Sequence, residues 1–363
     1  MNETTLTARH NARNARMAEF EGSIMPQQFS DPAEEHRAVR SAAGLFDVSH
    51  LGRIEISGAG ADNLLQGLFS RNVEQLPHGM AAYGVFCTES GGILDAVLLA
   101  RLPAQKNSTG FLLTTSAPAT AKVLTWLEGH AGSDAVIRDR TTELCQLALQ
   151  GPHAEAVLEA VSGARHKKIR RRHIKEMAIG GIPVLVSRTG YTGEPGYELF
   201  VPADRAPGLW DSLLTAGSGF GLLPCGMTCR DILRIEAGYL RFGIDIDETR
   251  SPVEAGLMKV VDLSKEFIGK AAIIRRRDEG ARETLVGFEL FDKGIPRPGG
   301  TIFSESREIG AVTSGNHSYS RRKDVGFGYV VTRYALAGQE IEVEVKDREI
   351  AAKVIEMPFY RKK

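Results

Sequence analysis

The sequence predicts an α+β protein in which blocks of mixed helices and strands are followed by a C-terminal domain of strands alone. Up to about residue 275, some segments carry apolar residues at helical spacing and others alternate between apolar and polar. From Glu283 onward the pattern changes to short alternating runs separated by turns, with no helix between them. The expected strands of this part are 284–290, 309–313, 325–331, 340–345 and 350–356. Short strands at this spacing are typical of a β-barrel or sandwich.

The first mixed block is expected to contain three helices and several strands. The helices are expected at 34–43, 62–69 and about 117–128, and the strands at 53–57, 83–88, 93–101 and 111–115. Gly44 is expected to end the first helix, and Ser116 to cap the third with Pro118 in its first turn. The residues 89–92 include two glycines and predict a hairpin turn between two of the strands.

The second mixed block follows the same logic. Strands are expected at 144–149, 183–188 and 197–201, and helices at 152–161, 206–215 and 226–237. A length of 363 residues favours two or three domains over one. We place the boundary before the strand-only part in the charged stretch 275–282.

Composition excludes several classes of protein. Lys and Arg total 45 and so do Asp and Glu, and this neutral balance argues against a dedicated nucleic-acid binder. No apolar run approaches the ~18 residues of a membrane span, and the N-terminus lacks the apolar core of a signal peptide. Four cysteines are too few for a disulfide framework, so reduced, buried thiols in a cytoplasmic protein are expected.

The signatures of several enzyme classes are absent from the sequence. Gly58-Ala59-Gly60 lacks the third glycine of a dinucleotide-binding fingerprint, and neither a Walker A sequence nor a G-x-S-x-G elbow is present. The nine histidines show no metal-ligand spacing, and Cys225 and Cys229 are four apart rather than three. No metal site is therefore expected.

Asp95 is the most informative single residue. It lies in the expected strand Ile93–Arg101, which is otherwise apolar around it, and alternation places it on the same face as Val97 and Leu99. A carboxylate there either is buried with a partner or lines a pocket, because an unpaired buried charge is costly. The strand pattern alone favours neither a structural nor a functional role.

A loop with three glycines at a spacing of three lies between two expected strands. It begins at Thr189 and contains Tyr191, and Glu198 follows at the start of the next strand. The helix at 226–237 carries Arg230 and Arg234, which are i,i+4 neighbours of the same sign, so we expect at least one to face an external partner. Without further information, the glycine-containing loop that begins at Thr189 is interpreted as an ordinary hairpin loop.

Three basic runs could attract an anionic ligand or an acidic protein surface. They are residues 166–173, 275–277 and 321–323. Charge runs are more often solvated faces, and we interpret them in that way in the first instance.

Taken in order along the chain, the motifs form the pattern of a known family. They run from Met25-Pro26 through FDVSH at 46–50, GGILD at 91–95, LQGP at 149–152 and GYTGE at 190–194, and continue with CRDILRIEAG at 229–238, FIGK at 267–270 and VTSG at 312–315. The sequence resembles the aminomethyltransferase of the glycine cleavage system, the T-protein, nearly from end to end. Each motif is weak alone, but their order and spacing are specific.

The resemblance implies a three-domain ring, or cloverleaf, of two mixed α/β domains and a C-terminal β-barrel. The first folate-binding domain would be discontinuous, at 1–50 plus 140–240. The second would comprise 51–139 plus 241–275, and the barrel 276–363.

The implied activity is transfer of a one-carbon unit from the aminomethyl-lipoyl arm of H-protein to tetrahydrofolate, with release of ammonia. By position, Asp95 matches the family's essential aspartate, a fixed carboxylate that can manage protons and stabilise positive charge. Glu198 and Arg230 match the pair that binds the pterin. The other implied wall residues of the folate pocket are Leu51, Tyr83, Val97, Ser116 and Tyr191.

Several positions depart from the family pattern. They are Ser23, Leu51, Ala96, Ser116 and Lys259. These departures keep a related function open, namely a tetrahydrofolate-dependent demethylase or methyltransferase that acts on another donor. A non-catalytic folate-binding protein of the iron–sulfur assembly type is a further alternative, but its cysteine motif is missing from the matching stretch at 263–270.

Overall fold

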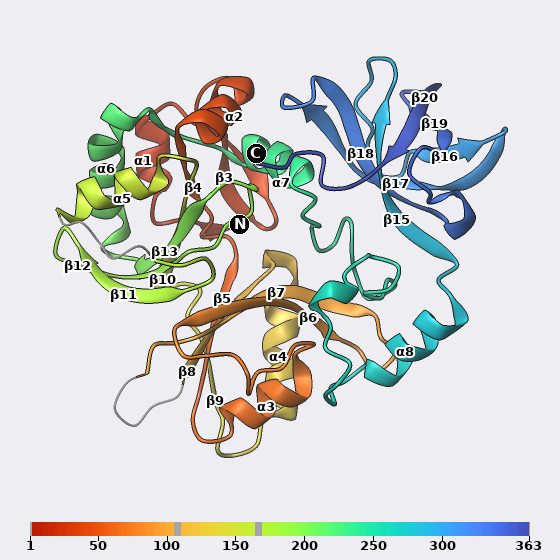
Figure 1. Ribbon diagram of the computed structural model, residues 1–363. Coiled ribbons are helices and arrows are strands. Elements are labelled where there is room, and N and C mark those ends of the chain that lie inside the picture. Colours follow the sequence, from red (N-terminus) through yellow and green to blue (C-terminus); the bar gives the residue numbers. More distant parts are fainter. Residues whose placement is uncertain (1, 105–109, 164–168, 363) are drawn as a thin grey trace. The chain divides into compact units, whose positions relative to one another are not determined.

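The computed structural model describes residues 2–104, 110–163 and 169–362 (Figure 1). These residues form two large β-sheets with associated helices, a small N-terminal sheet and a closed barrel. The small sheet has the order β1-β3-β2, from β1 (Asn2–Glu3), β2 (Arg16–Phe20) and β3 (Ser23–Gln28), with α1 (Thr7–Ala12) between the first two. The fold class expected from the sequence, mixed α/β domains followed by a barrel, is confirmed. The ring arrangement stays a prediction.

The first large sheet has six strands in the order β11-β12-β13-β10-β4-β14. Its strands are β4 (Ala43–Asp47), β10 (Leu144–Gln150), β11 (Ile174–Ile179), β12 (Ile182–Ser187), β13 (Gly196–Pro202) and β14 (Leu222–Pro224). Helices α5 (Ala154–Ser162) and α6 (Ala206–Gly217) cover one face, where Leu147, Leu199 and Trp210 share a buried core. Because β-strand side chains alternate, the opposite face carries the intervening residues of each strand.

The second large sheet has five strands in the order β6-β7-β8-β5-β9. They are β5 (Gly52–Ser57), β6 (Met80–Cys87), β7 (Ile93–Arg101), β8 (Gly110–Thr115) and β9 (Val136–Asp139). The associated helices are α3 (Ala61–Leu68), η1 (Ala117–Ala119) and α4 (Thr120–His130). The turn between β6 and β7 is the expected hairpin, because Gly91 has a φ of +82° and the Thr88 amide donates to the Gly92 carbonyl.

The C-terminal strands close into a barrel in the order β15-β18-β17-β16-β19-β20. They are β15 (Glu283–Leu290), β16 (Thr301–Ser304), β17 (Arg307–Ser318), β18 (Lys323–Val331), β19 (Glu340–Val345) and β20 (Arg348–Ile355), with η4 (Thr332–Tyr334) after β18. Phe288, Ile302 and Val343 belong to its buried core. The structure therefore decides between the barrel and the sandwich, since closure removes the sheet edges.

The remaining helices are α2 (Pro32–Ser41), η2 (Ser218–Phe220), α7 (Met227–Glu236), η3 (Met258–Val260) and α8 (Lys270–Glu279). The chain divides into two compact units, and one of the boundaries between them falls within α7. The first comprises 1–67, 72–84 and 96–231, and the second 68–71, 85–95 and 232–363.

Two local expectations are wrong. Helix α2 ends at Ser41, and Gly44 lies inside β4, where a Cβ would approach the side chain of Val39 to 2.4 Å. Ser116 precedes η1, but its side chain makes no capping hydrogen bond. The charged stretch in which we place the boundary comprises the end of α8 and the residues before β15, and the boundary itself stays a prediction.

Candidate functional site

The second face of the first large sheet carries a buried polar cluster around Glu198. Glu198 on β13 lies opposite Ala148 on β10, and Gln146, two residues away on β10, shares its face. The Gln146 amide nitrogen donates a hydrogen bond of 3.0 Å to one carboxylate oxygen of Glu198, and the Thr189 hydroxyl donates to the other. Both oxygens are thereby held, which fixes the plane of the carboxylate.

Burial and charge act on Glu198 in opposite directions. Desolvation raises its pKa above the ordinary value, while the Thr189 hydrogen bond, the Arg230 charge and the Gln146 hydrogen bond each lower it. The burial effect prevails. Glu198 is therefore a poised acceptor whose ionisation depends on its three neighbours.

Arg230 and Tyr191 form a second part of the cluster. Arg230 lies on α7, and its guanidinium sits 4.6 Å from the centroid of the Tyr191 ring, a cation–π geometry. Both side chains are half-buried. Together with Glu198 they offer a carboxylate acceptor, a guanidinium donor and an aromatic face, and this set suits a flat heterocycle that has both donors and acceptors on one edge.

Hydrogen bonds and packing from Gln150 hold the glycine-containing loop in its conformation. The Gln150 amide nitrogen donates to the carbonyls of Thr189 and Tyr197, and its oxygen accepts from the Thr192 hydroxyl at 2.9 Å. A Cβ at Gly190 would lie 2.0 Å from the Gln150 amide oxygen. The loop therefore requires glycine because it packs directly on this side chain.

Asp95 lies on β7 and is fully buried. Val97 and Leu99, expected on the same face, are 1% and 0% exposed. Asp95 belongs to the second compact unit, whereas the Glu198 cluster belongs to the first.

A segment after α7 holds the start of the Asp95 strand. The Ile93 amide donates to the carbonyls of Asp247 and Arg250, at 3.2 and 2.9 Å. A Cβ on Gly92 would lie 1.9 Å from the Glu248 carbonyl oxygen.

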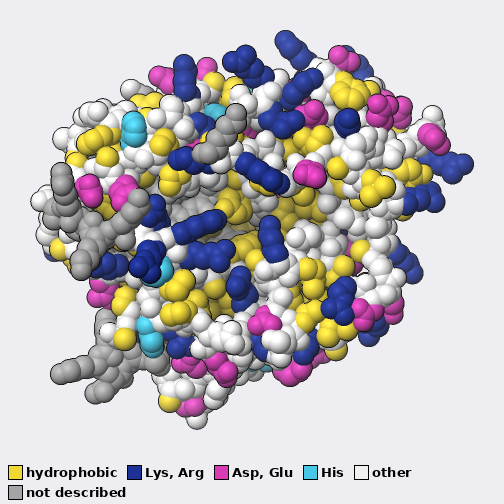
Figure 2. Space-filling model, in the orientation of Figure 1, with side chains coloured by type: hydrophobic (Ala, Val, Ile, Leu, Met, Phe, Trp, Pro, Cys, Tyr) yellow, Lys and Arg dark blue, Asp and Glu magenta, His cyan; other side chains and the backbone are white. Residues whose placement is uncertain are grey.

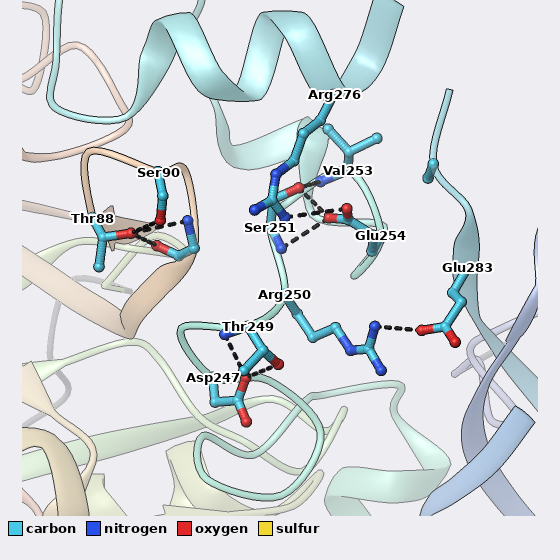
Figure 3. Close-up of polar contacts among 12 residues, drawn as sticks. Thr88, Ser90, Asp247, Thr249, Arg250, Ser251, Val253, Glu254, Arg276 and Glu283 are labelled. Atoms are coloured by element: carbon cyan, nitrogen blue, oxygen red, sulfur yellow. Dashed lines mark hydrogen bonds and ion pairs between the residues drawn. The ribbon is translucent and has the colours of Figure 1, made fainter. Parts of the chain in front are cut away.

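Figure 3 shows the same segment tied further along the chain. Arg250 pairs with Glu283, and both the amide and the hydroxyl of Ser251 donate to Glu254, which also pairs with Arg276. Burial opposes ionisation of Glu254, but the Ser251 donors and Arg276 prevail and lower its pKa. The segment thus has a defined shape, and through Ile93 it fixes the backbone two residues before Asp95.

The other expected pocket residues lie on four different elements. Tyr83 is half-buried on β6, and Val97 is on β7. Ser116 is half-buried before η1. Leu51 lies between β4 and β5, and its carbonyl accepts a hydrogen bond from the Arg53 guanidinium. The interactions described above link Arg230 to Glu198 by charge and to Tyr191 by ring contact, and the roles of the other four residues stay predictions.

The two arginines of α7 have different environments. Arg230 faces Tyr191, whereas Arg234 is 3% exposed and pairs with Asp245 at 2.5 Å. Arg234 also donates to the Ser314 hydroxyl, and Asp245 accepts from the same hydroxyl. Because Arg234 is part of a buried network, Arg230 is the arginine of this pair that can face an external partner.

Sequence reasoning missed Gln146 and the side chain of Thr189. Polar residues alternate along β10, where Gln146 and Gln150 flank apolar positions that face the core. This alternation was a usable signal for a polar second face.

Glu35, Cys225 and Cys229 form a buried cluster whose ligand atoms lie within 4.8 Å of one another. Glu35 already accepts from the amides of Phe29, Ser30 and Gly226. Burial raises the pKa of Glu35 and of the Cys225 thiol. Three ligand atoms fall short of the four thiolate or imidazole ligands usual for structural zinc, so the contacts assign the cluster to anchoring the N-terminus of α7.

The four cysteines, Cys87, Cys145, Cys225 and Cys229, are all buried and free, as expected. Of the departures from the family pattern, Ser23 is buried on β3, Ala96 on β7 is half-buried, and Lys259 in η3 is exposed. The first part of the basic run 166–173, up to Lys168, lies outside the described residues.

A cavity of about 700 Å³ lies at one end of the barrel. Its walls come from the turns after β15, β17 and β19, and its floor includes Leu290, Phe291 and Val345. The cationic lining residues are Lys293, Arg297, Arg322, Lys323, Lys346 and Arg348.

Its acidic lining residues are Asp292 and Asp324, and Asp324 is paired with His317 at 2.6 Å. Within the described ranges, none of the six cations forms an ion pair. This end of the barrel therefore carries uncompensated positive charge. Basic and acidic side chains both appear on the face drawn in Figure 2, and the total over the whole sequence is neutral.

Two family models match almost the whole chain. The GCVT N-terminal domain matches residues 6–265, and the glycine cleavage T-protein C-terminal barrel domain matches residues 284–361. The mixed domains, the closed barrel and these two matches thus place the chain in the T-protein class.

Individual relatives agree with this class. The aminomethyltransferase of Geobacillus kaustophilus is 42% identical over 96% of this chain and 95% of its own length. That of Halalkalibacterium halodurans is 39% identical over 100% and 99%. The crystal structure of the glycine cleavage system aminomethyltransferase T from Bartonella henselae superposes with a TM-score of 0.91 at 30% identity, covering 99% of this chain and 98% of its own.

The chain belongs to the aminomethyltransferase family, the T-proteins of the glycine cleavage system. The resemblance inferred from the sequence motifs is confirmed, and with it the assignment as an enzyme. Among the described residues, no helix is long and apolar enough to cross a membrane.

Proposed function

We propose that this protein transfers the one-carbon unit of an aminomethyl group from the lipoyl arm of H-protein to tetrahydrofolate, releasing ammonia. The observation that carries the proposal is the Glu198, Arg230 and Tyr191 cluster in a chain that matches the family nearly end to end. Two C–N bonds form on the folate, while the C–S bond to the lipoyl arm and the C–N bond of the departing ammonia break.

In the proposed roles, Glu198 and Arg230 bind the pterin and Tyr191 stacks beside it. The Glu198 carboxylate would accept from the amino and ring N–H groups of the pterin edge, and Arg230 would donate to its oxo group. Tyr83, Leu51, Val97 and Ser116 would contribute further walls. The donor set of the cluster fits this ligand because each edge group of the pterin has a counterpart.

Asp95 is assigned the chemical role. A fixed buried carboxylate can accept the proton lost when a folate amine attacks, and can stabilise the cationic carbon–nitrogen centre formed on the way. Its strand is held by Gly92 and by the 247–250 segment, so the carboxylate is positioned before the substrate arrives.

The basic end of the barrel is our candidate docking surface for the H-protein, whose surface we take to be acidic. Six cations without ion pairs around an apolar floor suit an acidic patch with a few exposed apolar side chains. Under this assignment, one of the three basic runs, at 321–323, contributes to the docking surface. A cytoplasmic location is part of the same proposal and agrees with four free, buried thiols.

The direct test supplies the purified protein with aminomethylated H-protein and tetrahydrofolate, and measures ammonia and 5,10-methylenetetrahydrofolate. We expect both products in equal amounts. Intact folate affinity without turnover would overturn the donor and favour the related demethylase or methyltransferase suggested by the departures at Ser23, Ala96 and Lys259.

The docking surface has its own test. Charge reversal by Lys293→Glu with Lys346→Glu should raise the KM for the aminomethylated carrier about tenfold at low salt, and leave the KM for tetrahydrofolate unchanged. The difference from wild type should shrink at high ionic strength, because salt screens exposed charges. Equal KM values for the carrier at low salt would exclude this end of the barrel.

A further inference from the structure

Gln146 is a buried side chain to which neither the family motifs nor the proposed function gives a role. It is 0% exposed and lies on β10, two residues from the position opposite Glu198 and on the same face. Its amide nitrogen donates to the Glu198 carboxylate at 3.0 Å, in a connection between two neighbouring strands of the first large sheet.

The amide oxygen of Gln146 is buried and has no hydrogen-bond partner among the described residues. A buried acceptor without a donor is costly, and native proteins keep few of them. If the amide were turned over, its oxygen would face a carboxylate oxygen and the two acceptors would repel. The Gln146 amide thus gives up one hydrogen bond in order to donate to Glu198.

The other groups around Glu198 do not replace the hydrogen bond that the Gln146 amide donates. Thr189 donates to the other carboxylate oxygen, and the Thr189 hydroxyl is itself 2.9 Å from the Ser187 hydroxyl. In the part of the chain that the structure describes, the charged group that acts on Glu198 is Arg230 on α7; the neighbours on β10 and β12, Gln146 and Ser187, are neutral. Gln146 is therefore the donor that holds the carboxylate from the β10 side.

We propose that Gln146 is a positioning residue that orients the Glu198 carboxylate so that it can accept the N–H groups of the pterin edge. The inference rests on the proposed role of Glu198 in binding tetrahydrofolate. It adds a specificity determinant to that site, because a protonated Glu198 would present a donor where the pterin also presents donors, and a rotated carboxylate would point its acceptor oxygens away from them.

Two near-isosteric substitutions separate positioning from packing. Gln146→Met keeps the length of the side chain and removes its donor, and Gln146→Glu replaces the donor with a second carboxylate. Without the donor, one of the contacts that lower the pKa of Glu198 is lost, so this pKa rises further. A second carboxylate at position 146 raises it more, because two like charges share the site.

The measurement is the dissociation constant of tetrahydrofolate as a function of pH, by calorimetric titration of the full chain. Wild type should bind progressively more weakly as the pH falls through the Glu198 transition. Gln146→Met should weaken binding roughly tenfold to a hundredfold at neutral pH and move the transition upward. Gln146→Glu should move it further in the same direction.

The matched control is Gln66→Met, which removes a glutamine that bridges Asn72 and the Val73 amide. It should leave the affinity and the transition where wild type has them. A purely structural role for Gln146 would lower the melting temperature and weaken binding equally at every pH, with the transition unmoved, and that result would overturn the inference. Failure of wild type itself to bind tetrahydrofolate would instead overturn the proposed function.

Discussion

Asp95→Asn should separate binding from catalysis. Asn has nearly the shape of Asp, so the fully buried position on β7 is neither emptied nor overfilled. The two hydrogen bonds that hold the start of the strand involve the Ile93 amide and are unaffected. We therefore expect the variant to fold and to bind tetrahydrofolate within about fivefold of wild type, a change of ~1 kcal/mol.

The effect on turnover is expected to be far larger. A carboxylate about 4 Å from a developing positive charge contributes about 4 kcal/mol at an effective dielectric constant near 20. Losing that contribution corresponds to about a thousandfold in rate, and this agrees with the ~10²–10⁴ typical of a lost general acid or base.

The assay compares single-turnover formation of 5,10-methylenetetrahydrofolate with the folate dissociation constant of the same preparation. Asp262→Asn removes an exposed carboxylate from a turn and serves as the charge control. A rate for Asp95→Asn within tenfold of wild type would refute the role of Asp95. A loss of folate affinity as large as the loss of rate would refute the division of labour between Asp95 and the Glu198 cluster.

Three further predictions concern what holds the site in place. Gly92→Ala should lower both turnover and the unfolding free energy, by about 1–3 kcal/mol for the latter, because its Cβ would meet the Glu248 carbonyl; Gly67→Ala, with nothing within 4 Å, should be harmless in a paired melting experiment. Burial opposes ionisation of Asp47, but hydrogen bonding and charge from His10 prevail and lower its pKa. The ionised Asp47 carboxylate therefore stabilises the folded state above the ordinary Asp pKa of 3.8, and this stabilisation is lost as the pH falls through the lower pKa of the folded state. Asp47→Asn should accordingly make the melting temperature fall less steeply on the acid side of its pH profile. Arg234→Met should cost about 3–5 kcal/mol in denaturant unfolding, since it leaves the carboxylate partner buried and unpaired, and an unchanged midpoint would contradict that estimate.

Local patterns predicted much of the secondary structure. The strand Ile93–Arg101 was predicted to the residue, because a long apolar run bounded by a glycine turn has few alternatives. The strand-only C-terminal part was predicted from its turns, although β16 was missed because it has four residues. The helix α8 was missed because it has many charged residues and only two buried ones, Ala272 and Ile273, which are adjacent and show no helical spacing.

The sequence by itself determined the family, the order of the elements and the candidate residues Asp95, Glu198 and Arg230, because motifs and periodicity are properties of neighbouring residues. Only the tertiary structure decided how Arg230 and Arg234 differ, since their environments come from the loop at Tyr191 and from Asp245. It likewise decided that Gln146 holds Glu198 across two strands that lie about 50 residues apart in the sequence. The three basic turns around the end of the barrel are brought together in the same way. Hydrogen-bond partners and charge clusters of this kind depend on strand register and barrel closure, and these follow from packing between distant parts of the chain.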